Sequence, residues 1–161
     1  MMKRIFLWCV MLACCVGIYA QGLKTVTWSA YGLTFKVPET MLVEEDSEFD
    51  FLLNNALYYV SVHSLESDDM DVHGDLGGLS EALKTLADED EVTEQSEIVP
   101  FDLKQFHGVW LTGKAHDEES CYCACLMTKD AGSVFYISVI YNTVSGKSVE
   151  RILKSFRMEE E

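Results

Sequence analysis

The densest group of potential metal ligands lies in a short acidic segment near the middle of the chain. Its oxygen and nitrogen donors are Asp69, Asp71, His73 and Asp75. Compared with the calcium loop of an EF-hand, these residues occupy positions 1, 3, 5 and 7. Position 12 is Ser80 instead of a glutamate, and a predicted strand precedes the loop instead of a helix. The segment is either a weak divalent-cation site or, as we favour, a solvated acidic loop, and we assign no metal ligand.

Three cysteines alternate in the string Cys-Tyr-Cys-Ala-Cys, at Cys121, Cys123 and Cys125. The string lies in an apolar run that predicts a strand, so the three sulfurs point to one face. Residues two apart on a strand have Cα atoms about 6.5 Å apart, whereas a disulfide brings Cβ atoms to about 3.8 Å. The spacing also differs from the Cys-x-x-Cys pattern of zinc and redox sites. We predict three unpaired thiols buried on a sheet face, rather than a soft-metal or redox site.

The remaining histidines do not belong to a recognisable catalytic motif. His63 ends a predicted strand, His107 lies just before Gly108, and His116 enters an acidic loop. The sequence contains no His-Glu-x-x-His, no Gly-x-Ser-x-Gly, no P-loop and no Gly-x-Gly-x-x-Gly. We therefore expect each histidine to be a surface residue or a satisfied core residue. The sequence predicts no catalytic residue, no cofactor and no enzymatic activity.

The charge of the chain excludes two classes of partner. The 161 residues include 27 Asp and Glu against 12 Lys and Arg, which gives a formal net charge of −15. Nucleic acid and anionic lipid both attract basic surfaces, so neither is an expected partner. Acidic residues are concentrated in residues 66–97, the acidic middle segment, where Lys84 is the only base. This segment is either a solubilising connection or a docking face for a basic partner.

The first twenty residues have the pattern of a secretory signal peptide. Lys3 and Arg4 precede an apolar run of twelve residues, 5–16, and Ala20 offers a small residue at the cleavage point. The run is shorter than the about 20 apolar residues of a membrane-spanning helix. Two alternatives are an uncleaved anchor and a lipoprotein modified at Cys14. We predict a leader over residues 1–20 and a single mature domain over residues 21–161, without a membrane span.

Apolar residues at alternating positions predict a series of strands separated by turns. The predicted strands are 25–30, 33–37, 49–53, 56–64, 98–103, 109–115, 121–128 and 134–141. Pro100 cannot donate to a central ladder, so its strand is expected at an edge of the sheet. Pairing Thr128 with Ser133 places Cys125 opposite Tyr136. Both faces of this late hairpin are then apolar, which is typical of strands covered on both sides.

Two segments have the periodicity of amphipathic helices. The apolar stripe of the first consists of Leu79, Ala82, Leu83 and Leu86. The second runs from about residue 147 to 157, with Ser145 as the expected N-cap and a stripe of Val149, Ile152, Leu153 and Phe156. Strands and helices in this order predict an α+β domain, an antiparallel sheet flanked by helices.

Both ends of the predicted domain resemble the PsbP-like superfamily. Residues 31–38, Tyr-Gly-Leu-Thr-Phe-Lys-Val-Pro, are similar to its opening pattern, and the strand 134–139 followed by a helix ending at Phe156 is similar to its close. This superfamily includes extrinsic photosystem subunits, DcrB-type periplasmic proteins and a Ran-binding import factor. The resemblance implies an α/β/α sandwich and a non-enzymatic accessory or binding role. Its members share no catalytic set, so no functional residue is transferred.

These observations lead to one expectation of function. The chain is expected to be an exported bacterial accessory or binding protein, periplasmic or extracellular, that contacts another envelope protein. The contact would use the acidic middle segment or an exposed sheet edge. The alternative is a periplasmic protein that binds a small ligand or a divalent metal through residues 69–75.

Overall fold

The computed structural model describes residues 22–65 and 75–160, so the predicted leader and Asp69, Asp71 and His73 lie outside the described residues. The strands are β1 (Leu23–Trp28), β2 (Leu33–Pro38), β3 (Leu42–Asp46), β4 (Asp50–Asn54), β5 (Tyr58–Leu65), β6 (Val99–Asp102), β7 (Phe106–Lys114), β8 (Ser120–Thr128), β9 (Val134–Tyr141) and β10 (Arg157–Met158). The helices are α2 (Leu76–Glu89), the short 3-10 turn η1 (His116–Glu118) and α3 (Gly146–Lys154).

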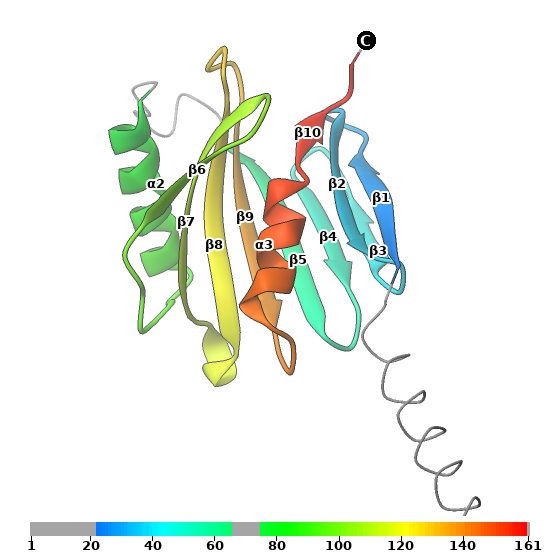
Figure 1. The fold of residues 1–161 in the computed structure, drawn as a ribbon, viewed down its shortest axis with the longest axis vertical. Coiled ribbons are helices and arrows are strands. Elements are labelled where there is room, and N and C mark those ends of the chain that lie inside the picture. The colour runs from blue at the N-terminus through cyan, green and yellow to red at the C-terminus, as the bar shows by residue number, and fades with distance from the viewer. Residues whose placement is uncertain (1–21, 66–74, 161) are drawn as a thin grey trace, which may run out of the picture.

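Seven antiparallel strands form one large sheet in the order β3-β4-β5-β9-β8-β7-β6 (Figure 1). The late hairpin has the predicted register, with Cys125 opposite Tyr136 and Leu126 opposite Phe135. The strand that contains Pro100 lies at one edge, as its missing backbone donor requires. The opposite edge is β3, a strand that the sequence analysis did not predict.

A second, three-stranded sheet has the order β1-β2-β10. Its hairpin pairs Trp28 with Leu33 across the turn that contains Gly32, which has a φ of 61°. Glycine adopts this left-handed conformation without the strain that a Cβ would bring. The third strand, β10, has two residues and pairs Arg157 with Thr34. The C-terminal end of the described chain is thereby joined to the second strand.

The two helices lie on opposite faces of the large sheet (Figure 1). Leu79 and Leu83 of α2 pack against β7 and β8 on the face that carries the three cysteines. The other face is covered jointly by α3 and the small sheet, whose Trp28 and Phe35 belong to the larger core. The predicted α+β fold with helices on both faces is confirmed, and the small sheet covers part of the second face.

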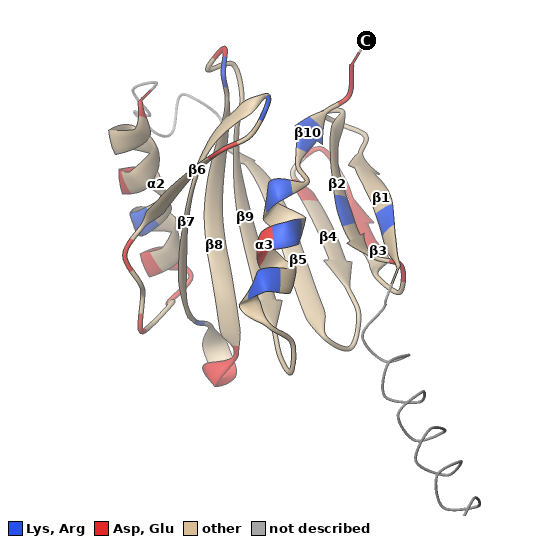
Figure 2. Cartoon of the chain, viewed as in Figure 1, with Lys and Arg blue, Asp and Glu red and all other residues tan. Residues whose placement is uncertain are grey.

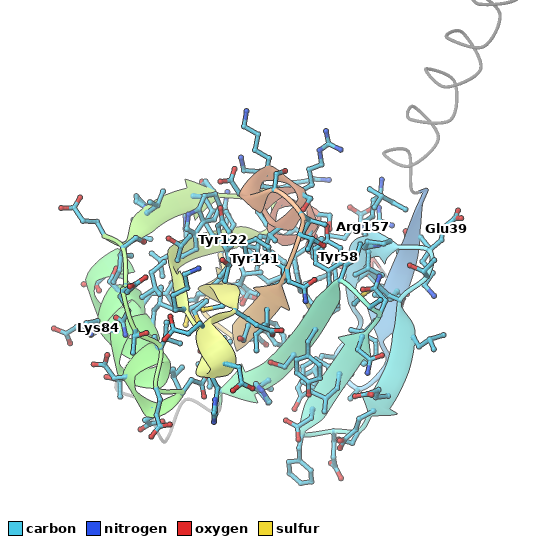
Figure 3. The ribbon with its side chains drawn as sticks, turned by 90° about the horizontal axis from the view of Figure 1, so that it is seen from below. Glu39, Tyr58, Lys84, Tyr122, Tyr141 and Arg157 are labelled. Atoms are coloured by element: carbon cyan, nitrogen blue, oxygen red, sulfur yellow. The ribbon has the colours of Figure 1, made fainter. Side chains whose placement is uncertain are left out.

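Tyrosine hydroxyls hold α3 above the sheet. Tyr58 donates to the Ser148 hydroxyl at 2.8 Å, and Tyr122 donates to Glu150 at 3.1 Å. Figure 3 shows Tyr58, Tyr122 and Tyr141 beneath this helix. Ser145 stands at the predicted N-cap, although its side chain makes no capping hydrogen bond. The polar contacts fix the position of α3, while its apolar stripe closes the core.

Candidate functional site

Among the described residues, α2 covers only part of its face of the large sheet. It packs over β7 and β8, and Leu65 at the end of β5 joins the same core, whereas the described part of the chain places no helix on this face of β3 and β4. Register places Leu52, Ser61 and Ser138 in one row across this part of the face, and Asn54 and Tyr59 in the next. Leu52 is half-buried, and Tyr59 is 37% exposed. This part of the sheet therefore combines the apolar Leu52 and the aromatic Tyr59 with the polar side chains of the two serines and Asn54.

Strand β3 is exposed along its whole length. Three of the seven exposed large apolar residues in the described part of the chain, Leu42, Val43 and Phe49, lie on β3 or in the turn after it, and a fourth, Tyr59, lies on β5, two strands inward. Phe49, in the turn before β4, is 73% exposed. We call this region, with the acidic residues Glu44, Glu45 and Asp50, the β3–β5 surface. Exposed apolar groups gathered in one place are typical of an interaction site.

Carboxylates surround the apolar part of this surface. Partial burial raises the pKa of Tyr59, and the negative charges of Glu44, Asp50 and Glu45 raise it further. The Asn54 side-chain amide donates to Glu44 across the strand pair. The negative charges of Glu44, Glu45 and Asp50 act together on Tyr59. This negative potential indicates that the β3–β5 surface favours a cationic partner.

A polar chain of residues separates this surface from α2. His63 pairs with Asp50 through its Nδ1 atom, and its ring stacks on Tyr136 with 6.3 Å between ring centroids. Tyr136 in turn donates to Asp90, beyond the end of α2, at 2.6 Å. Burial, followed by the neighbouring Cys123 and Asp90, raises the pKa of Tyr136. His63, predicted to be either a surface residue or a satisfied core residue, is half-buried and has a carboxylate partner.

The other two described histidines lie elsewhere. His107 pairs with Asp102 at 2.6 Å on the β6 side of the sheet. His116 lies in the exposed η1 turn, 3.2 Å from Asp117. The structure therefore does not bring the three histidines together. Among the described residues, no group of three His, Cys, Asp or Glu side chains is arranged to hold a metal ion.

The three cysteines are buried and unpaired, as predicted. They pack with Leu79, Leu83 and other residues of the smaller core. Burial, with the nearby Cys123 as a second cause, raises the pKa of Cys125. Because the thiols are enclosed in the core, this cluster has the character of packing rather than of reactive chemistry.

Asp75 is the one member of the predicted acidic loop that the structure describes. Its carboxylate accepts a hydrogen bond from the Gly78 amide at 2.8 Å and forms the N-cap of α2. The capping role accounts for this aspartate without a metal, because N-cap carboxylates satisfy free amides of the first turn. Farther along the acidic middle segment, Asp88 accepts hydrogen bonds from Lys84 and Gln95.

Sequence reasoning missed the β3–β5 surface because its residues come from three separate segments. Leu42 and Val43 are followed by three acidic residues, a pattern without strand periodicity. The placement of these residues depends on the pairing of β3 with β4, and β3 has a bulge between Val43 and Glu45.

No described helix is long and apolar enough to cross a membrane.

Solved structures of low sequence identity share this fold. The Ran-binding protein Mog1p of Saccharomyces cerevisiae matches with a TM-score of 0.57 and 10% identity, over 86% of this chain and 96% of that chain. PsbP of Synechocystis sp. PCC 6803 matches with a TM-score of 0.57 and 16% identity, over 89% of this chain and 96% of that chain. These matches confirm the predicted PsbP-like fold.

Sequence comparisons assign the chain to a family, which the shared fold alone does not. A search of curated proteins gave no match. A family model described as dihydro-orotase-like matches residues 39–145, from the end of β2 to the N-cap of α3. This match covers more than half of the chain, and the protein therefore belongs to the dihydro-orotase-like family.

Proposed function

We propose that this protein is an exported bacterial accessory protein, without catalytic activity, that binds another envelope protein through the β3–β5 surface. The observation that carries the proposal is the fully exposed edge strand β3, with Leu42 and Phe49 beside a part of the sheet that no helix of the described residues covers. Such a surface offers both unpaired backbone groups and apolar contact area. The fold of a Ran-binding protein, shared at low identity, supports a binding role.

The expected partner segment is extended, apolar and basic. An added strand would pair with the free edge of β3, while its alternate side chains contact Leu42 on the neighbouring strand. Glu44 and Glu45 would repel the same edge of a second copy of this chain, since edge carboxylates oppose self-pairing. These two carboxylates therefore favour a cationic partner and disfavour aggregation.

A photo-reactive amino acid in place of Leu42 tests the surface directly. Illumination in the envelope of the source bacterium is expected to give a crosslinked product with one protein. The same replacement at Val99, on the opposite edge and 42% exposed, is the matched control. Raising the salt concentration should weaken the Leu42 product, since it screens Glu44 and Glu45. Equal products from both positions, or none from Leu42, would refute the proposed surface.

Absence of catalysis is part of the same proposal, because the family description refers to an enzyme. The open face carries the Asp50–His63 pair, and the described residues contain no group of side chains arranged to hold a metal ion beside it. We expect the purified protein to leave dihydro-orotate unchanged, with and without added Zn²⁺. Turnover that disappears in His63→Gln but not in His116→Gln would overturn this part of the proposal.

Export is tested by the mass of the protein recovered from the source bacterium. Cleavage after Ala20 is expected to give a chain that begins at Gln21. A chain beginning at a lipidated Cys14 would indicate a lipoprotein instead, and an intact first residue would exclude cleavage. The alternative of a divalent-cation carrier depends on Asp69, Asp71 and His73, which lie outside the described residues.

A further inference from the structure

Basic residues gather on the outward side of α3, against the acidity of the whole chain. Lys147, Arg151 and Lys154 are spaced by four and three residues, so they lie on one face of the helix. Arg157 follows on β10, and all four are exposed. We call these four residues the α3 stripe. Figure 2 shows Lys and Arg along α3 and on the neighbouring strands β1, β2 and β10.

Few carboxylates neutralise this stripe. Within the described residues, its only ion pair joins Lys154 to Glu150, at 4.0 Å. The Lys154 ammonium also lies 5.6 Å from the centre of the Trp110 ring. Lys36, exposed on β2, adds a further cation beside the helix, since its backbone amide donates to the Ser155 hydroxyl at 2.8 Å. The α3 stripe is thus a positively charged patch on a protein whose net charge is negative.

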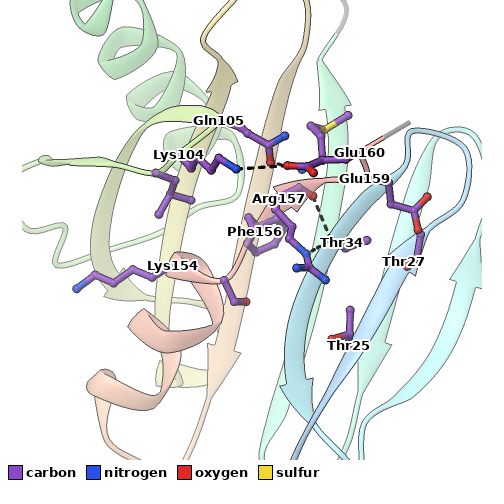
Figure 4. A pocket seen from close by; sticks show the side chains of 13 residues that line it. Thr25, Thr27, Thr34, Lys104, Gln105, Lys154, Phe156, Arg157, Glu159 and Glu160 are labelled. Carbon is purple, nitrogen blue, oxygen red and sulfur yellow. Dashed lines mark hydrogen bonds and ion pairs between the residues drawn. The ribbon is translucent and has the colours of Figure 1, made fainter.

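A groove of about 840 Å³ continues from the C-terminal end of the stripe (Figure 4). Arg157 lies in it with its Nε atom donating to the Thr34 hydroxyl at 3.1 Å. This hydrogen bond fixes the guanidinium and leaves its two terminal amino groups for a carboxylate. Thr25 and Thr27 line the groove on β1. Glu159 and Glu160 also line the groove, and Glu160 pairs with Lys104 at 3.3 Å.

We propose that the α3 stripe and this groove dock an acidic, extended segment of a partner protein. The nine residues of α3 span about 14 Å, the length of about four residues of an extended chain. A carboxylate every second residue would meet the cations of the helix, and one would reach Arg157. A duplex or an anionic membrane is much larger than this patch, so it would also approach the acidic remainder of the surface.

The stripe is independent of the β3–β5 surface. Leu42 and Tyr59 of the β3–β5 surface lie on the face of the large sheet opposite α3, and the charges of the two regions have opposite signs. The partner segments that they favour are therefore different, and each can bind or fail without the other.

A fluorescent decapeptide of alternating Glu and Ser is the probe, with its anisotropy measured in about 20 mM and about 150 mM NaCl. K147Q/R151Q is expected to weaken binding about tenfold. K84Q/K129Q changes the net charge equally outside the stripe and should change affinity less than twofold. Lys84 lies on α2, away from α3 (Figure 3). Thermal unfolding of each variant confirms folding, which matters most for R157Q because Arg157 contacts Thr34.

Each outcome of this titration decides the proposal. Weaker binding for K147Q/R151Q and for R157Q alone, with no binding of a peptide in which Gln replaces Glu, supports it. Equal losses in K84Q/K129Q would show a general charge effect and overturn it. So would the absence of binding in about 20 mM NaCl, or tighter stripe-dependent binding of duplex DNA or phosphatidylserine vesicles. Phe49→Asp should leave the peptide affinity unchanged, which separates this result from the proposed function.

Discussion

Small side chains at Cys121, Cys123 and Cys125 form the part of the sheet on which α2 packs. Alternation along a strand was sufficient to predict that their sulfurs share one face and are buried. The register of the late hairpin also gave Tyr136 as the neighbour of Cys125. The contact of Tyr136 with Asp90 could not be predicted, because Asp90 follows a helix whose path over the sheet is not shown by local patterns. The hydrogen bond between these two residues depends on how α2 crosses the sheet.

Replacement of Tyr136 by Phe tests this hydrogen bond. Loss of the bond to Asp90 is expected to lower the free energy of unfolding by about 1 kcal/mol at pH 7. The pKa of Tyr136 is raised in the folded state, so its contribution is complete below the unfolded value of 10.0 and declines as the pH rises above it.

Urea unfolding between about pH 7 and pH 11 measures both effects. The wild-type protein should lose stability above pH 10, and Tyr136→Phe should show a shallower decline. Tyr31→Phe, which removes an exposed hydrogen bond to Glu48, is the comparison for a phenol elsewhere on the chain. Identical slopes for Tyr136→Phe and the wild type would mean that Tyr136 does not cause the alkaline decline.

At the scale of elements, most strands and both long helices could be predicted from periodicity. The exceptions, β3 and β10, have too little periodicity of their own and are held by pairing with β4 and β2. The small sheet could not be separated from the large one, because local patterns do not show which strands are neighbours. One face of the late hairpin is covered by α2, and the other face is covered by α3 together with the small sheet.

The start of α2 is an element boundary with a testable cause. Asp75→Ala should cost about 1 kcal/mol, because the Gly78 amide loses its acceptor. Asp75→Asn should be nearly neutral, since asparagine caps a helix as well as aspartate does. Chemical unfolding with and without about 1 mM CaCl₂ distinguishes a cap from a ligand. Stabilisation by calcium in the wild type, but not in Asp75→Asn, would show that this carboxylate binds the ion.

At the scale of the whole molecule, the sequence gives the net charge directly, but the distribution of charge over the surface could not be predicted from it. The spacing of Lys147, Arg151 and Lys154 indicates a basic helix face, whereas the addition of Lys36 depends on a contact between residues far apart in sequence. The net charge of −15 therefore gave no sign that one surface is negatively charged and another is positively charged. The composition argument against anionic partners applies to extended polyanions and not to a short acidic segment.

Self-repulsion on this scale predicts a salt effect on stability. Raising NaCl from about 20 mM to about 300 mM should increase Tm by about 2–4 °C, because screening relieves repulsion that is stronger in the compact state. Glu44→Gln/Glu45→Gln should raise Tm in low salt and reduce the increase. Calorimetry at both salt concentrations gives these values. A fall in Tm with salt would show that attractive ion pairs, instead of repulsion, dominate the surface.

The enclosed thiols have a consequence for maturation. All three cysteines of the described chain are unbonded, and the native packing of α2 over β8 uses them as small apolar groups. The domain therefore reaches its native state without an oxidant or a disulfide isomerase, and a reductant such as dithiothreitol should leave its refolding rate unchanged. Folding of a protein built in this way can proceed equally well with or without oxygen.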